Sequence, residues 1–216
     1  MTLVAMSLFV GACSPSNTAS NAIVTTSTLS TETTMEGAVE LVVSDQQLTS
    51  GTYTRSDFTP RVTFELSGAE WYAVQAAAGF FDIQRDVGSP HVIAVQFGNV
   101  EAAYGGDDER VEPASAAEAV TIVGSHAQLT VLAQDGSRTA GLEGTVVVVE
   151  NASETQARIF EVPAGALAID PGRRLWAALF DVGDGILAIM VGGSAERWDE
   201  ALLAAEPILE TVTIDP

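Results

Sequence analysis

The C-terminal part of the chain contains the stretch that decides the fold: Leu175-Trp-Ala-Ala-Leu-Phe-Asp-Val182, then Gly183-Asp184-Gly185, then Ile186-Leu-Ala-Ile-Met-Val191. Two apolar runs of strand length surround a three-residue turn. The glycines on either side of Asp184 permit the positive φ angles that tight hairpin loops require. The pattern therefore predicts an antiparallel hairpin.

A helix is predicted directly after this hairpin. Ser194 is expected to cap it, and Trp198, Leu202 and Ala205 recur at spacings of four and three, so they fall on one face. Proline cannot continue a helix without losing a hydrogen bond, so Pro207 is expected to end it. Residues 208–214 place Ile208, Val212 and Ile214 on one mostly apolar strand face and are expected to return as a strand.

The rest of the folded part is expected to consist of strands with a second short helix. Ser115 with Glu118 three positions later is a capping-box pattern, and it predicts a helix that ends near Gly124. Alternating or apolar runs between turn residues predict strands at 51–58, 61–66, 78–85, 92–97, 128–132, 144–150 and 158–162. The fold class is therefore predicted to be α+β, an antiparallel β-sheet flanked by a few helices.

Three stretches give the chain a resemblance to a known family. The run 186–214, with Gly192-Gly193 before the helix and Pro207-Ile-Leu-Glu-Thr-Val212 after it, resembles the closing unit of PsbP-like domains, named after an extrinsic photosystem subunit. The opening from Gly51-Thr-Tyr53 to Trp71, and Gly141-Leu-Glu-Gly144, are similar to stretches of bacterial lipoproteins with a PsbP-like (LpqN-type) domain. The resemblance implies an α/β/α sandwich. It implies no activity and no site residue, because such folds serve as scaffolds in unrelated settings.

The N-terminus carries a pattern of its own. Residues 1–12 form a short apolar run that ends in Val10-Gly11-Ala12, followed by Cys13, the only cysteine. This pattern resembles the lipobox of bacterial lipoproteins, and it predicts a signal peptide over 1–12 and lipidation of Cys13. The run is too short for a membrane-spanning helix. No Lys or Arg precedes it, so either the true start lies upstream of Met1 or the signal is degenerate.

A tether and one folded domain are expected after the lipobox. From Ser14 to about Met35, half of the residues are Ser or Thr, a composition that cannot bury enough apolar surface to order the chain. Residues 13–39 are therefore predicted to be a disordered spacer, and residues 40–216 a single PsbP-like domain. The protein is expected on the outer face of a cell membrane, held there by its N-terminal lipid.

Charge and residue usage exclude several functions. The formal net charge is −20, from 29 acidic and 9 basic residues, and every basic residue is an arginine. Such a field repels nucleic-acid phosphates, so no nucleic-acid partner is expected. Without lysine there is no Schiff-base chemistry and no P-loop. With Cys13 assigned to lipidation, no cysteine remains for a disulfide or a cysteine metal site.

The candidates for chemistry are few. His91 and His126 lack the ligand spacing of a metal site, and Ser125-His126 lack the flanking glycines of a nucleophile elbow. The acidic runs Asp107-Asp108-Glu109 and Asp181 to Gly185 could attract Ca²⁺ but are interpreted as a solvated loop and a hairpin turn. Trp71-Tyr72 could line a ligand groove and are interpreted as core. No cofactor, metal or catalytic residue is predicted.

Two classes of function stay open. The first is a lipid-anchored binding module that recognises an envelope protein, a peptide or an apolar ligand in a cleft of the sheet. The second is an envelope hydrolase that uses His91 or His126 with a carboxylate. Only the hydrolase requires a histidine within hydrogen-bond reach of a carboxylate at a concavity. The dispersed polar residues favour the binding module.

Overall fold

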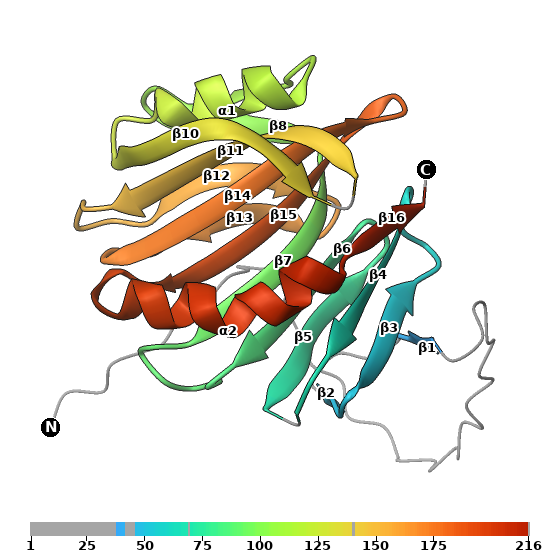
Figure 1. The fold of residues 1–216 in the computed structure, drawn as a ribbon. Helices are drawn as coiled ribbons and strands as arrows, with labels where there is room; N and C mark the ends of the chain where they lie inside the picture. Colours follow the sequence, from blue (N-terminus) through green and yellow to red (C-terminus); the bar gives the residue numbers. More distant parts are fainter. Residues whose placement is uncertain (1–37, 42–45, 69, 140, 216) are drawn as a thin grey trace, which may run out of the picture.

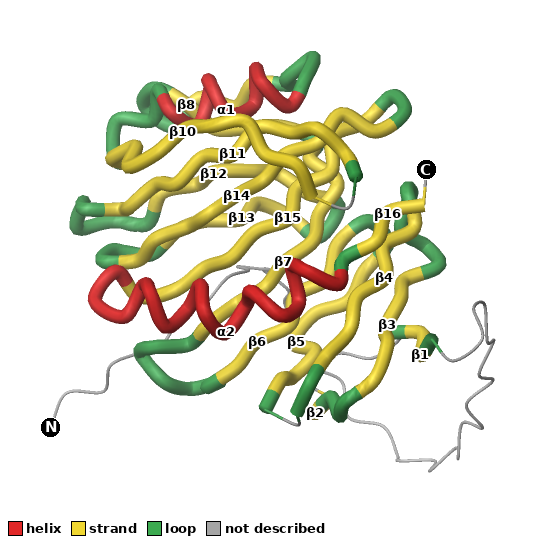
Figure 2. Tube along the Cα trace, viewed as in Figure 1, coloured by secondary structure: helices red, strands yellow, loops and turns green. Residues whose placement is uncertain are grey.

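The computed structural model describes residues 38–41, 46–68, 70–139 and 141–215, and in that part the chain is mostly β-strand with two α-helices (Figures 1 and 2). The predicted signal peptide and Cys13 lie outside the described residues, as does nearly all of the predicted spacer. Its last residue, Val39, belongs to a short strand, β1 (Val39–Glu40), that pairs with Tyr53 and Thr54. The described part of the fold therefore includes the end of the predicted spacer.

A central sheet organises the described part of the chain, and all its neighbouring strands are antiparallel. Its eight strands, in spatial order, are β10 (Leu129–Thr139), β11 (Leu142–Asn151), β14 (Arg173–Val182), β15 (Gly185–Ser194), β7 (Ile93–Val100), β6 (Phe80–Arg85), β5 (Trp71–Ala77) and β2 (Gln46–Gln47). The predicted hairpin is confirmed as β14 and β15. It pairs continuously from Arg173 with Ser194 to Val182 with Gly185, and Gly183 adopts a φ of 59° in the turn.

Each face of the central sheet is covered by one helix and one smaller sheet. One smaller sheet, here called the N-terminal sheet, contains β1, β3 (Gly51–Arg55), β4 (Arg61–Leu66) and β16 (Thr213–Asp215); the other, the outer sheet, contains β13 (Gly165–Ile169), β12 (Ala157–Val162), β8 (Ala102–Gly105) and β9 (Glu109–Val111). The N-terminal sheet and α2 (Trp198–Thr211) share one apolar core with the central sheet. The outer sheet and α1 (Ala116–Gly124) share the other.

The α/β/α sandwich expected from the resemblance is therefore corrected to a mostly β fold of three layers. Four segments for which no strand is predicted from the sequence form strands, namely β5, β8, β9 and β13. The physical reason is the width of the central sheet. A single helix is about 10 Å across and cannot bury both the apolar residues of β14 and β15 and those of β6 and β7, so a second sheet completes each layer.

The predicted helix after Ser115 is confirmed as α1. The Ser115 hydroxyl accepts a hydrogen bond from the Glu118 backbone N–H at 3.2 Å, and the Glu118 carboxylate accepts one from the Ala114 N–H at 2.7 Å. These bonds satisfy donors that a helix N-terminus otherwise leaves unpaired. The helix turns Ala116, Ala119, Val120 and Val123 into the core.

The predicted end of the second helix is wrong. Ser194 is followed by a 3₁₀ turn (Ala195–Arg197) to which its side chain makes no capping bond, and α2 then runs through Pro207 to Thr211. Pro207 lies on the exposed side, while Ala205, Ile208 and Val212 are buried at helical spacing on both sides of it. Burial of this continuous face outweighs the roughly 3 kcal/mol that an internal proline costs. The strand predicted at 208–214 is accordingly reduced to β16.

Candidate binding groove

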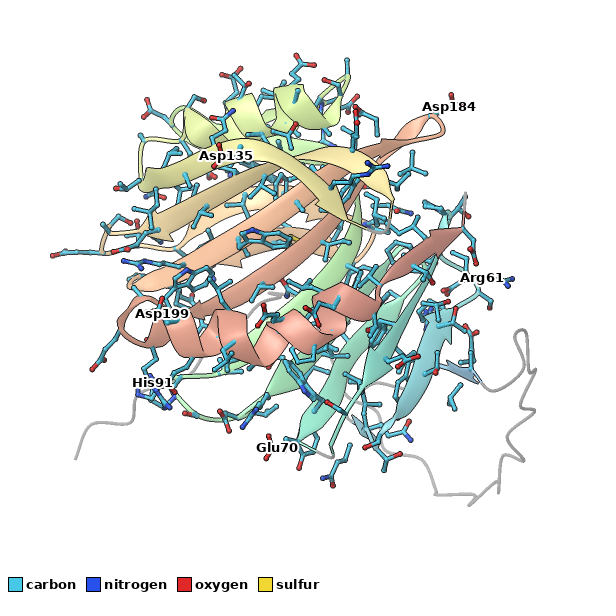
Figure 3. All side chains as sticks on the ribbon, viewed as in Figure 1. Arg61, Glu70, His91, Asp135, Asp184 and Asp199 are labelled. Atoms are coloured by element: carbon cyan, nitrogen blue, oxygen red, sulfur yellow. The ribbon has the colours of Figure 1, made fainter. Side chains whose placement is uncertain are left out.

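A groove lies between α2 and the central sheet. It is lined by Arg138 of β10, Trp176 of β14, and Asp199, Leu202, Leu203, Glu206, Leu209 and Glu210 of α2, and its volume is about 680 Å³. Small-molecule and peptide side-chain sites usually have volumes of about 300–1,000 Å³. In Figure 3, Asp199 lies near the start of α2 and Asp135 on β10, with strands of the central sheet between them.

The apolar wall of the groove comes from two elements. Trp176, Leu202 and Leu209 are half-buried and pack against the core on the α2 side, whereas Leu203 is 69% exposed. Leu203 is the most exposed of the large apolar side chains in the described part of the chain. Exposed apolar surface that gathers in a concavity is typical of an interaction site, unlike a single scattered residue.

The position of α2 explains why these residues stay uncovered. A Cβ atom on Gly193 of β15 would lie 2.6 Å from the Cβ of Ala201, so the helix rests directly on that strand. The N-terminal sheet packs over the neighbouring strands, where Phe64 stacks on Phe81 and Phe97 with ring centroids 5.6 and 5.5 Å apart. Trp176, on β14 at the far side of β15, lines the groove together with residues on the flank of α2.

The sequence holds a signal for this groove that the prediction did not use. Successive helical residues point about 100° apart, so the adjacent leucines Leu202 and Leu203 cannot both face the core. Leu202 was placed on the inner face with Trp198 and Ala205, but the buried residue there is Ala201. The exposure of Trp176 could not be predicted, because it lies in an unbroken apolar run that does not indicate which face of the strand is uncovered.

His91 does not meet the geometric condition for an acid–base pair. It lies in the loop between β6 and β7 and lines a hollow of about 300 Å³ with Arg85, Arg197 and Glu200. The carboxylate of Glu200 is held by Arg197, and within the described residues His91 forms no ion pair. Its Nδ1 atom is buried without a hydrogen-bond partner. The hollow therefore contains a histidine but no carboxylate positioned to act with it.

His126 does not meet the condition either. Its Nε2 atom lies 3.7 Å from Asp108 Oδ1, beyond hydrogen-bond distance, and its side chain is only 1% exposed. Nδ1 accepts a hydrogen bond from the Gln128 N–H at 3.2 Å. Ser125, its neighbour, is occupied in the backbone structure, since its hydroxyl donates to the Ile122 carbonyl at 2.7 Å and accepts from the Gly106 N–H at 3.2 Å. The two side chains perform structural roles.

The acidic runs also serve the fold. Asp108 forms an ion pair with Arg158, whose guanidinium lies 4.5 Å from the ring centroid of Tyr104. Asp181 was interpreted as a hairpin residue, but its carboxylate accepts the Ala116 N–H at 2.7 Å, at the positive end of α1. Asp184 lies at the hairpin tip (Figure 3). Among the described residues no group of three or more His, Cys, Asp or Glu is arranged to hold a metal ion.

Trp71 and Tyr72, the candidate groove aromatics, separate onto the two faces of β5. Trp71 is 4% exposed and belongs to the core under the N-terminal sheet, as predicted, while Tyr72 is 37% exposed. Neither lines the groove beside α2. The aromatic side chain that does so is Trp176.

A buried polar cluster was not predicted. Asp82 and Gln84 of β6 and Gln96 of β7 are 3%, 3% and 1% exposed, and they point to the face opposite Phe81 and Ile83. Gln84 Nε2 donates to Asp82 Oδ2 at 2.7 Å, and within the described residues Asp82 Oδ1 and both amide atoms of Gln96 have no partner. Burial raises the pKa of Asp82 to about 6, against the opposing effects of the neighbouring Gln84 and Gln96 side chains.

No protein-family model matches the chain, and no curated protein matches it. Solved structures do match. One is the cyanobacterial PsbP (CyanoP) of Synechocystis sp. PCC 6803, with 11% identity and a TM-score of 0.44, covering 80% of this chain and 97% of that one.

Two further solved structures match the chain. LpqN of Mycobacterium tuberculosis, described as involved in cell envelope biogenesis, has 10% identity and a TM-score of 0.38, covering 72% of this chain and 84% of its own. A protein from Bacteroides thetaiotaomicron VPI-5482 has 10% identity and a TM-score of 0.36, covering 72% of this chain and 45% of its own. PsbP-like and LpqN-type proteins, which the sequence resembles, are thus among the structural matches. These matches bring no residue role with them.

Proposed function

We propose that this chain is a lipid-anchored envelope protein that acts as a binding module, and that its ligand site is the groove beside α2. The observation that carries the site is the wall of Trp176, Leu202, Leu203 and Leu209 around a volume of about 680 Å³. Burial of apolar surface contributes about 25 cal/mol per Å², so an apolar ligand or segment would gain free energy by covering this wall.

The anchoring rests on the N-terminal sequence alone. Val10-Gly11-Ala12-Cys13 provides the lipid-accepting cysteine and the residues after it provide a Ser- and Thr-rich spacer. None of the helices in the described part is long and apolar enough to cross a membrane. In this proposal the lipid holds the domain at the membrane surface, because acidic headgroups repel an acidic domain.

The binding site is tested with a neutral solvatochromic dye on the purified 216-residue chain. Leu203→Ser should weaken the fluorescence increase of the dye several-fold. Leu132→Ser is the matched control, because Leu132 is also exposed, at 45%, and does not line the groove. Equal dye binding by the wild type and the Leu203 variant would exclude the groove as an apolar site.

The anchoring is tested by fractionation of the host cell. Cys13→Ser should move the protein from the membrane fraction to the soluble fraction, because no other residue can carry the lipid. Ser16→Ala, in the spacer, should leave it in the membrane fraction. If the Cys13 variant stays with the membrane, lipidation at this residue does not provide the anchor.

A further inference from the structure

Two of the three acidic residues along the groove, Glu206 and Glu210, are placed against the local energetics of α2. Glu206 and Glu210 lie one turn apart, where like charges repel each other, and Glu210 lies in the last turn of the helix, at the negative end of its dipole. The last turn of α2 contains no basic residue. Glu206 and Glu210 therefore destabilise the helix that carries them, and a role outside the helix would account for their presence.

These carboxylates are also unpaired. Within the described residues Asp199, Glu206 and Glu210 form no ion pair, although seven of the nine arginines bond to carboxylates or a backbone carbonyl: Arg55, Arg85, Arg110, Arg158, Arg173, Arg174 and Arg197. On the other side of the groove stands one cation, Arg138. The carboxylates of Asp199, Glu206 and Glu210, here called the rim, outnumber this one cation. The edge of the groove is therefore negative around an apolar wall.

We infer that the occupant of this groove is a cationic amphipathic segment of a partner protein. The inference rests on the proposed function and narrows its ligand class. Apolar side chains of the segment would cover Leu203, Leu209 and Trp176, while Lys or Arg side chains pair with the rim carboxylates. With a rise of 1.5 Å per residue, Asp199 and Glu206 are about 10 Å apart along α2, and Glu206 and Glu210 about 6 Å.

This spacing specifies the segment. A helix lying along α2 matches the rim when its basic residues are separated by seven and four positions, with leucines on the adjoining stripe. An anionic bilayer does not match, because its headgroups carry the same sign as the rim.

The test uses three synthetic helical peptides with the same leucine stripe and with Lys, Gln or Glu at the rim positions. The Lys peptide should bind the full chain at least about tenfold more tightly than the Gln peptide, which corresponds to three partly exposed ion pairs of about 0.5 kcal/mol each. The Glu peptide should bind most weakly. Added salt should reduce the difference between the Lys and Gln peptides, because it screens exposed charges.

A charge-matched pair of variants locates the effect. Asp199→Asn with Glu206→Gln and Glu210→Gln should remove the preference for the Lys peptide. Asp107→Asn with Glu154→Gln and Asp184→Asn removes the same net charge from exposed positions outside the groove and should preserve the preference. If both triple variants lost the preference for the Lys peptide equally, overall charge would explain that preference, and the inference would be overturned.

The remaining outcomes separate the two proposals. If the Gln and Lys peptides bind equally and Leu203→Ser weakens both, the groove is an apolar site without cationic specificity, so only the inference fails. If no peptide binds, the inference fails, and the dye experiment decides on the groove by itself. If phosphatidylcholine vesicles bind the Cys13→Ser chain and Leu203→Ser abolishes that binding while no peptide competes, the occupant is a bilayer and the inference is overturned.

Discussion

The two helices cover opposite faces of the central sheet and differ in how completely they do so. On α1 the side chains left exposed are Ala117, Glu118 and Thr121, whereas α2 leaves Leu203 69% exposed and two further leucines half-covered. A helix that only covers a core presents small or polar residues to water. Surplus apolar residues on the flank of α2 therefore distinguish a helix that also forms a site from one that only completes the fold.

Both helices lie close to a strand, α1 to β8 of the outer sheet and α2 to β15 of the central sheet. A Cβ on Gly105 of β8 would lie 2.6 Å from the Ile122 carbonyl oxygen of α1, as a Cβ on Gly193 would lie 2.6 Å from Ala201 of α2. The closest contact between helix and strand is therefore similarly tight for α1 and α2. The difference between the helices lies in what their outer flanks carry.

The largest effect is expected where α2 enters the core. Trp198 is 8% exposed, and its truncation to Ala should lower the free energy of unfolding by about 3–5 kcal/mol through loss of burial and creation of a cavity. Urea denaturation measures the change. Glu200→Ala, on the exposed side, should leave the urea midpoint nearly unaltered. An unchanged midpoint for the Trp198 variant would mean that packing of α2 on the sheet does not stabilise the fold.

The next effect is a pH dependence on the face opposite α2. The pKa of Asp82 is raised from 3.8 to about 6 in the folded state, so the folded protein holds this proton more tightly than the unfolded chain. Its contribution is fully present below pH 4 and is lost as pH rises through about 6. A shift of this size corresponds to about 3 kcal/mol.

Asp82→Asn isolates this contribution. The variant should show a flatter dependence of unfolding free energy on pH between about 4 and 6 than the wild type, as measured by denaturation at several pH values. Asp184→Asn, at an exposed hairpin tip, serves as the control. Parallel pH profiles for the wild type and the Asp82 variant would contradict a buried, titrating carboxyl group at this position.

A smaller effect compares the two helix contacts directly. Gly105→Ala and Gly193→Ala should each destabilise by about 1–3 kcal/mol, because the added methyl overpacks the contact. Gly105→Ala should cost more. Its methyl meets the Ile122 carbonyl and the Ser125 hydroxyl at 2.6 and 2.7 Å, at a helix end fixed by hydrogen bonds, while the methyl on Gly193 meets only side-chain carbon atoms. Thermal denaturation of both variants checks the order, and a reversed order would show α2 to be the more rigidly held helix.

The smallest effect is expected in the groove. Leu203→Ser should change the free energy of unfolding by less than about 0.5 kcal/mol, because the side chain is mostly in water already. The same variant should weaken ligand binding, so stability and binding separate at this residue. A loss of stability comparable to that of Trp198→Ala would place Leu203 in the core and remove the distinction between the flank and the inner face of α2.

Several elements were predictable because local chemistry specifies them. The turn Gly183-Asp184-Gly185 fixes the β14–β15 hairpin, and Ser115 with Glu118 fixes the start of α1. The strand β4 matches its predicted range, Arg61–Leu66. The role of Asp181 was not predictable, because its hydrogen bond joins residues 65 positions apart.

The sequence by itself determined the acidic character of the chain, the antiparallel hairpin, the capped helix α1 and the N-terminal lipobox pattern, because each depends on composition or on neighbours a few residues apart. Only the tertiary structure decided that α2 continues through Pro207, that Asp82 is buried and that Trp176 and Leu203 border one groove. These features depend on which distant surfaces meet. The free energy of burying a whole helix face or sheet face exceeds the local preference of any single residue.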